Sequence, residues 1–175
     1  MNIDKIELGD KIPNEFPVII EIASGGVPIK YEIDKDSGAI FLDRFVGTSM
    51  FYPCNYGFIP HTLSGDGDPV DVLLITPIPV MAGCVVKCRP IGVLLMEDES
   101  GTDEKIVCVP ITKATPYYKN INKVDDLPEI LVKQIVHFFE RYKDLEPDKW
   151  VKVLGYQNLE KAQEFIKEGI ARAKK

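Results

Sequence analysis

The sequence predicts a mainly β fold that ends in two helices. Short apolar or alternating segments, separated by Gly and Pro turns, fill the first two-thirds of the chain. The last third carries two segments whose apolar residues recur with helical spacing. Many short strands followed by two helices indicate a small β-barrel with helices packed outside it, and an open sandwich is the alternative.

The expected strands share an apolar or alternating pattern bounded by turn residues. They cover residues 17–22, 29–33, 39–46, 70–75, 84–96, 105–109 and 150–153. The second is the clearest, because Ile29, Tyr31 and Ile33 share one face of a strand. Pro90 and Gly92 interrupt the longest segment, so we expect a bend or bulge there.

Two helices are expected after these strands. In the first, apolar residues between 131 and 142 recur at i, i+4, i+7, i+8 and i+11, which places them on one face. The pair Asp125–Asp126 can cap this helix, with Pro128 in its first turn. Asn158 can cap a final helix that has an apolar stripe from 159 to 170.

The composition is that of one globular domain spanning residues 1–175. Hydrophobic residues make up 45% and charged residues 27%, and the formal net charge is −6. That charge argues against a broad surface for binding a phosphate backbone. We find no signal-peptide core and no apolar run of the ~18 residues that a membrane span needs, so we expect a cytoplasmic protein.

The four cysteines and two histidines do not indicate a zinc site. No CxxC pair occurs, and reduced, mostly buried thiols are the simplest expectation for a cytoplasmic protein. Cys54 is a weak candidate nucleophile, because no histidine is obviously placed to activate it. P-loop, HExxH and GxSxG motifs are absent, and an EF-hand starting at Asp66 fails because Asp71 and Pro77 stand where Gly and Glu are needed.

An acidic turn is the most informative stretch. Asp66, Asp68 and Asp71 lie within six positions, and Gly67 and Pro69 bend the chain between them. An apolar strand follows, so carboxylates are expected at the mouth of a buried strand. Carboxylates fixed close together suit a hard cation such as Mg²⁺. An acidic surface turn is the equal alternative when this stretch is taken alone.

Two other charged groups could join this turn in space. They are Asp98, Glu99 and Asp103 in an acidic segment, and Glu21, Lys30, Glu32 and Arg44 on expected strands. Taken alone, the acidic segment favours a solvated hairpin loop, and Lys30 and Glu32 favour an ordinary solvent-facing side of a strand. If the groups converge, like charges ~4 Å apart repel by about 4 kcal/mol at an effective dielectric of 20. Paired divalent ions would compensate, and the Lys and Arg would serve anionic oxygens.

The run Asp66–Val72, read as DGDPVDV, closely resembles the signature of soluble family I inorganic pyrophosphatases of the short bacterial type. Further segments look like family segments in family order, namely 29–32, 43–45, 51–60, 98–99, 103–105 and 137–143. The likeness covers nearly the whole chain, from about residue 21 to residue 153. It implies a five-stranded OB-like β-barrel flanked by two helices. It also implies Mg²⁺-dependent hydrolysis of pyrophosphate to two phosphates, with several Mg²⁺ ions per site, in a homohexamer.

The resemblance assigns roles residue by residue. Asp68 would be the general base near the attacking water. The carboxylates that would hold metal ions are Glu32, through water, and Asp66, Asp71, Asp98 and Asp103. The side chains that would bind phosphate oxygens are Lys30, Arg44, Tyr56, Lys105, Tyr142 and Lys143. The supporting residues would be Glu21, Tyr52 and Glu99.

Two other functions stay open at this point. A different metal-dependent phosphoesterase would share the metal ions, but it needs a base- or sugar-binding surface that the sequence does not reveal. A non-catalytic OB-type module would bind an oligonucleotide through basic grooves and stacking aromatics. The net charge of −6 counts against it, and Tyr52, Tyr56 and Phe58 are its only aromatic cluster. His137, on the apolar helix, is expected to be either an interface residue or simply packed.

Overall fold

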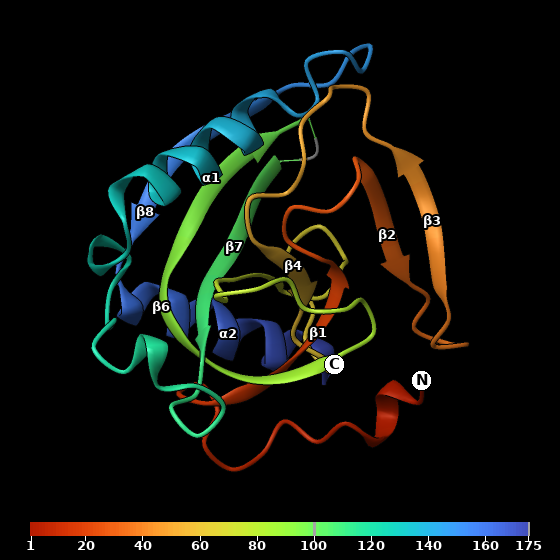
Figure 1. Cartoon of the computed structure of the whole chain (residues 1–175). Helices are drawn as coiled ribbons and strands as arrows, with labels where there is room; N and C mark the ends of the chain where they lie inside the picture. Colours follow the sequence, from red (N-terminus) through yellow and green to blue (C-terminus); the bar gives the residue numbers. More distant parts are fainter. Residues whose placement is uncertain (100, 175) are drawn as a thin grey trace.

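The computed structural model describes residues 1–99 and 101–174 (Figure 1). Eight strands form within these residues: β1 Phe16–Ile22, β2 Ile29–Ile33, β3 Ile40–Phe45, β4 Asn55–Phe58, β5 Asp71–Leu74, β6 Val85–Asp98, β7 Gly101–Pro110 and β8 Val151–Gln157. The α-helices there are α1 Glu129–Arg141 and α2 Leu159–Ala173. Single 3-10 turns cover η1 Ile3–Lys5, η2 Pro116–Tyr118 and η3 Val124–Asp126. None of these helices is long and apolar enough to cross a membrane.

Five of the strands close into a ring. Their order is β1-β4-β5-β7-β6, and β6 pairs back onto β1. Only β5 and β7 run parallel among these pairs. Strand β8 extends the sheet from β6, and β2 with β3 forms a separate hairpin beside the ring (Figure 1). The predicted fold class is confirmed: the chain is mainly β with two helices, and the ring is consistent with an OB-like fold.

The expected bend in the longest strand is confirmed. The register of β6 shifts between Pro90 and Gly92. Before the bend β6 pairs with β1, and after it β6 pairs with β8. Because β7 pairs with β6 on both sides of the bend, one long hairpin carries the far end of β6, at Asp98, away from the closed ring. This end forms one wall of the cleft described below.

The apolar core lies on both sides of the ring. On one side, Phe138 and Phe139 of α1 pack against Tyr52 and Leu73. On the other, α2 packs apolar side chains such as Ile166 against the buried faces of β1, β5 and β6. Each fully buried side chain of this size contributes about 1.5–3 kcal/mol. The helices therefore hold the ring from two directions, and α1 supports the strands that carry the cleft.

The helix termini follow prediction in one case and not in the other. Asn158 caps α2 as expected, since its side chain accepts a hydrogen bond from the backbone N–H of Lys161 at 3.1 Å. The prediction that Asp125–Asp126 caps α1 was wrong, because Pro128 occupies the N-cap position. Asp126 instead accepts hydrogen bonds from the N–H groups of residues 122 and 123 and closes the 3-10 turn η3.

Strand β4 was not predicted, and the acidic segment holds more strand than expected. Asn55–Phe58 is buried on both faces, so it lacks the alternation that identifies a half-exposed strand. The solvated loop expected over 97–104 is largely ladder, because β6 continues to Asp98 and β7 begins at Gly101. Cross-strand pairing with β8 stabilises this end of the hairpin despite its charge.

Gly57 makes the closest backbone approach in the ring. A Cβ atom at this position would lie 1.9 Å from the carbonyl oxygen of Ile19 on β1. We expect Gly57→Ala to lower the free energy of unfolding by at least ~3 kcal/mol, because the clash is with backbone and cannot relax by a rotamer change. Urea unfolding followed by circular dichroism measures this. Gly65→Ala is the matched control, since no atom lies within 4 Å of a Cβ there; equal stabilities of the two variants would contradict the prediction.

Candidate active site

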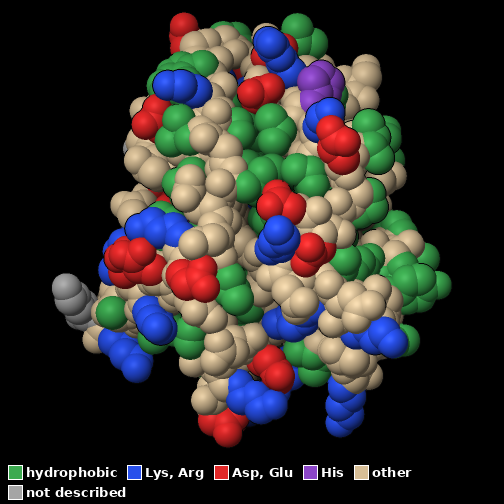
Figure 2. Space-filling model, turned by 90° about the vertical axis from the view of Figure 1, so that its left-hand side faces the viewer, with side chains coloured by type: hydrophobic (Ala, Val, Ile, Leu, Met, Phe, Trp, Pro, Cys, Tyr) green, Lys and Arg blue, Asp and Glu red, His purple; other side chains and the backbone are tan. Residues whose placement is uncertain are grey.

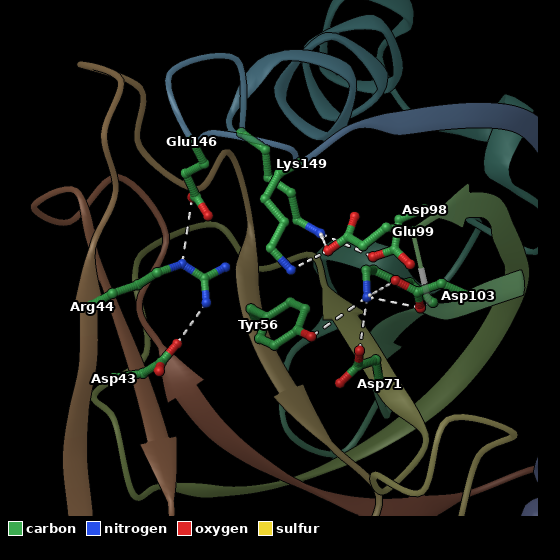
Figure 3. Close-up of polar contacts among 11 residues, drawn as sticks. Asp43, Arg44, Tyr56, Asp71, Asp98, Glu99, Asp103, Glu146 and Lys149 are labelled. Atoms are coloured by element: carbon green, nitrogen blue, oxygen red, sulfur yellow. Dashed lines mark hydrogen bonds and ion pairs between the residues drawn. The ribbon is translucent and has the colours of Figure 1, made fainter. Parts of the chain in front are cut away.

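A polar cleft of about 300 Å³ opens at one end of the ring. Its walls come from β2 and β3, from the acidic turn before β5, from the β6–β7 hairpin and from the loop after α1 (Figure 3). The lining side chains are Lys30, Arg44, Tyr56, Asp66, Asp68, Asp71, Asp98, Glu99, Thr102, Asp103, Lys105, Tyr142, Lys143 and Lys149. Acidic and basic groups from segments far apart in the sequence therefore face one space.

Lys105 lies at the centre of the cleft floor. Its Nζ lies 2.7 Å from Asp71 Oδ2, 3.0 Å from Asp103 Oδ1 and 3.5 Å from the Tyr56 hydroxyl. The parallel register of β5 and β7 places Asp71 directly opposite Lys105. Burial alone would lower the pKa of this lysine, but the charges of Asp103 and Asp71 outweigh it and raise the pKa well above its usual value. Lys105 is therefore a charged, nearly buried ammonium that holds two carboxylates.

A second group of ion pairs lies at the tip of the β6–β7 hairpin. Lys143 Nζ donates to Asp98 Oδ2 at 2.9 Å and lies 3.7 Å from Glu99 Oε1, which also accepts from Lys149. The slight burial of Glu99 would raise its pKa, but the two lysines lower it to about 2. Glu99 therefore stays ionised and ties the loop after α1 to the hairpin.

The β2–β3 hairpin supplies a third group. Lys30 and Arg44 are cross-strand partners, and Asp43 bridges them at 3.3 Å from Lys30 Nζ and 2.8 Å from Arg44 Nη1. Lys30 also bonds Glu32. Two positive charges directly opposite each other on paired strands repel. The negative charge of Asp43 offsets the repulsion between Lys30 and Arg44. The expected solvent-facing role is wrong for Lys30, which lines the cleft, whereas the Glu32 side chain is 48% exposed.

The acidic turn separates its three aspartates. Gly67 has a φ of +97°, a conformation that favours glycine, so the chain reverses sharply between Asp66 and Asp68. Asp66 Oδ1 accepts from the N–H of Asp68 at 3.0 Å and so is partly committed to the turn. Within the described part of the chain, Asp68 makes no ion pair, whereas Asp71 is held by Lys105. Three neighbouring carboxylates therefore have three different surroundings.

A smaller hollow of about 50 Å³ adjoins the cleft behind Asp68 and Asp71. Glu21 and Glu32 line it with Lys30. Glu21 is buried on β1, and its Oε1 accepts from the N–H of Ile33 at 2.8 Å. Burial raises the pKa of Glu21 to about 7, with the charge of Asp71 adding to the effect and the hydrogen bond from Ile33 opposing it.

The structure brings most of the predicted site residues to one place. Asp68, the six expected phosphate-binding residues, four expected metal ligands and Glu99 line the cleft. Glu21 and Glu32 line the adjoining hollow, while Tyr52 is buried behind the cleft and packs on Tyr56 and Phe138. Among the described residues, no three acidic, His or Cys side chains lie close enough together to form a ready metal cluster. Lysine ammonium groups lie between the carboxylates instead.

Sequence reasoning missed two charged residues here. Lys149 lines the cleft, and Glu146 lies 3.4 Å from Arg44 Nε (Figure 3). Both belong to the loop that follows α1, which has no strand or helix pattern and gave no signal of its own. The only available hint was the presence of two lysines, Lys143 and Lys149, in one short segment of an acidic chain.

The remaining candidates lie elsewhere. His137 is exposed and lines a separate surface pocket with Phe51 and Gln134, so the expectation that it is simply packed was wrong. All four cysteines are free, and three of them are buried. Burial raises the pKa of Cys54 to about 12, which leaves it a poor nucleophile.

Comparisons with known proteins identify a family for this chain. The model of the inorganic pyrophosphatase family matches residues 18–174. The chain belongs to this family. It is 62% identical over 172 residues to an inorganic pyrophosphatase of Rickettsia typhi, covering 98% of this chain and 96% of the relative. Solved inorganic pyrophosphatases from Thermus thermophilus and Helicobacter pylori superpose with a TM-score of 0.93 each, at 43% and 46% identity, with coverage of 98% or more of each chain.

The buried Glu21 gives a pH prediction for the metal-free protein. The unfolded carboxyl ionises near 4.5 and the folded one near 7, so between these pH values the folded state binds more protons. The contribution of the Glu21 carboxyl to the free energy of unfolding therefore falls as the pH rises through this range. Glu21→Gln, which keeps the acceptor for Ile33, should gain up to about 3 kcal/mol relative to wild type between pH 4.5 and pH 7. Urea unfolding across this range tests it, and a constant difference between the two proteins would refute it.

Proposed function

We propose that this chain is a Mg²⁺-dependent inorganic pyrophosphatase that hydrolyses pyrophosphate to two phosphates. The observation that carries the proposal is the cleft, which combines carboxylates, lysines, an arginine and tyrosines in a member of this family. Relatives named inorganic pyrophosphatase match over nearly the whole chain, which supports the same activity here.

The basic and tyrosyl side chains of the cleft fit a small, highly charged anion. Pyrophosphate carries three to four negative charges near neutral pH. Lys30, Arg44, Lys105 and Lys143 would neutralise its oxygens, and the tyrosine hydroxyls would donate hydrogen bonds without adding negative charge. Charge that moves onto the leaving phosphate would meet the same groups, so their contacts strengthen as the reaction proceeds.

The carboxylates of the cleft fit Mg²⁺, which prefers oxygen ligands. Asp66, Asp71, Asp98 and Asp103 would hold it, and Glu32 would act through water. When bound, Mg²⁺ would neutralise phosphate charge and lower the pKa of the attacking water. Lys105 and Lys143 form ion pairs with three of these carboxylates.

Asp68 is proposed as the general base. It lines both the cleft and the adjoining hollow, and it is exposed. Asp66 is engaged by its own turn and Asp71 by Lys105, whereas the carboxylate of Asp68 is available to accept a hydrogen bond from water. This difference in surroundings supports a proton-accepting role for Asp68 and ligand roles for its neighbours.

The charge on the face that carries α1 and β8 does not favour a nucleic-acid surface there. Figure 2 shows acidic and basic side chains interspersed over this face, whereas nucleic-acid binding calls for a basic patch. We further propose a single-domain, cytoplasmic protein that assembles as a homohexamer, as the family resemblance implies. Exposed apolar side chains on β3, such as Phe41 and Phe45, support burial against another subunit.

Phosphate release tests the activity directly. With Mg²⁺, the protein should release phosphate from pyrophosphate and act far more slowly on ATP in a parallel assay, because most side chains that line the cleft are charged groups suited to phosphate and metal ions. Chelation by EDTA should abolish the release. Turnover of ATP or nucleic acid without any action on pyrophosphate would overturn the proposed function.

The division of labour in the acidic turn is testable with two isosteric variants. Asp68→Asn should lower kcat at least ~100-fold, because a proton acceptor is lost, yet keep the rise in thermal midpoint that Mg²⁺ causes in the wild type. Asp71→Asn should lose much of that Mg²⁺-dependent rise. Thermal unfolding with and without Mg²⁺, together with phosphate release, separates the roles. The assignment is incorrect if Asp68→Asn loses the Mg²⁺ effect while Asp71→Asn retains it.

A further inference from the structure

Glu146 contacts Arg44 on the edge of the guanidinium that faces away from the cleft. Its Oε1 lies 3.4 Å from Arg44 Nε, and its side chain is 19% exposed (Figure 3). Both atoms are buried, and within residues 1–99 and 101–174 neither has a hydrogen-bond partner. The contact is therefore an ion pair whose geometry is not that of a hydrogen bond. A turn of the guanidinium that aligns its Nε–H with Oε1 would make it one.

The rest of the guanidinium is oriented by a second carboxylate. Arg44 Nη1 donates to Asp43 Oδ2 at 2.8 Å. Figure 3 shows the other terminal nitrogen pointing away from both carboxylates, toward the side of the cleft where Tyr56 and Lys149 lie. Two carboxylates thus hold two edges of the fork and leave the third for the cleft, where a planar fork binds phosphate oxygens well.

The backbone around Glu146 also belongs to the cleft wall. The N–H of Glu146 donates to the carbonyl of Lys143 at 2.8 Å, and the N–H of Lys149 donates to the carbonyl of Glu146 at 3.3 Å. Leu145, which precedes Glu146, lies beside Gly47 just after β3, since a Cβ atom added at Gly47 would be 3.4 Å from the Cβ of Leu145. Glu146 therefore joins the loop that carries two cleft lysines to the hairpin that carries Arg44.

We propose that Glu146 is a positioning residue for substrate binding: by holding the Nε edge of Arg44, it aims the guanidinium at the phosphate site. This proposal rests on the proposed pyrophosphatase function. Glu146 does not line the cleft, so it acts through Arg44 and not on the substrate. The Nε contact shortens when the guanidinium turns to meet a phosphate, since hydrogen bonds in a site without its ligand are often long and tighten on binding.

The test is a double-mutant cycle in the full-length protein. Glu146→Gln should raise the KM for pyrophosphate about tenfold, as expected for loss of one charge-assisted contact, and change kcat less than about threefold. In an Arg44→Lys background, which lacks the Nε edge, Glu146→Gln should have no further effect. Asp144→Asn is the matched control, because Asp144 lies on the same loop but pairs with Arg141 at 3.8 Å.

Calorimetric binding of methylenediphosphonate, with Mg²⁺ present, separates this proposal from the activity. Its Kd should rise with Glu146→Gln by the same factor as the KM, whether or not the wild type hydrolyses pyrophosphate. If the wild type binds this analogue but releases no phosphate, the proposed function fails while the positioning role is still measured. An unchanged Kd and KM, an equal loss in the Arg44→Lys background, or an equal loss with Asp144→Asn would overturn the positioning role.

Discussion

The ammonium group of Lys105 is the interaction on which the cleft depends. It is nearly buried, and it joins Asp71 on β5 to Asp103 on β7 across a parallel pair of strands. Without it, two carboxylates would face each other in partly desolvated surroundings, where like charges ~4 Å apart repel by about 4 kcal/mol at an effective dielectric of 20. The aromatic rings of Tyr56 and Phe139 also lie within 6 Å of this cation, which adds a favourable electrostatic contact. Lys105 is therefore a buried, charged residue at the bottom of the cleft and not an exposed residue at its edge.

Other lysines of the cleft also pair with aspartates, and their side chains are more exposed than that of Lys105. Lys143 balances Asp98, and Lys30 balances Asp43. Each cation is therefore positioned by carboxylates before any anion arrives, which reduces the entropy lost on binding. The arrangement also explains why no compact cluster of acidic groups forms in the described chain. The carboxylates instead pair with the lysines that share the cleft with them.

Much of this architecture was predictable from local patterns, and the failures have physical reasons. Alternation identified β2 with its correct bounds, and Asn158 identified the start of α2. Strand β4 was missed because both of its faces are buried, which removes alternation. The candidate site was predicted mostly through the family resemblance, since convergence of distant residues leaves no local trace. Glu146 had neither pattern nor motif, and only its distance from Arg44 reveals it.

The closure of the ring by β1 and β6 has a consequence for how the protein forms during synthesis. Residues 16–22 must wait for residues 85–88 before the ring can close, and the loop with Lys149 follows later still. Such long-range pairing slows folding, because a large loop must be closed before its contacts stabilise it. Strand β1 therefore leaves the ribosome well before β6, its second pairing partner, has been synthesised. The cleft, whose last wall is made by residues 142–149, is complete only when most of the polypeptide has been translated.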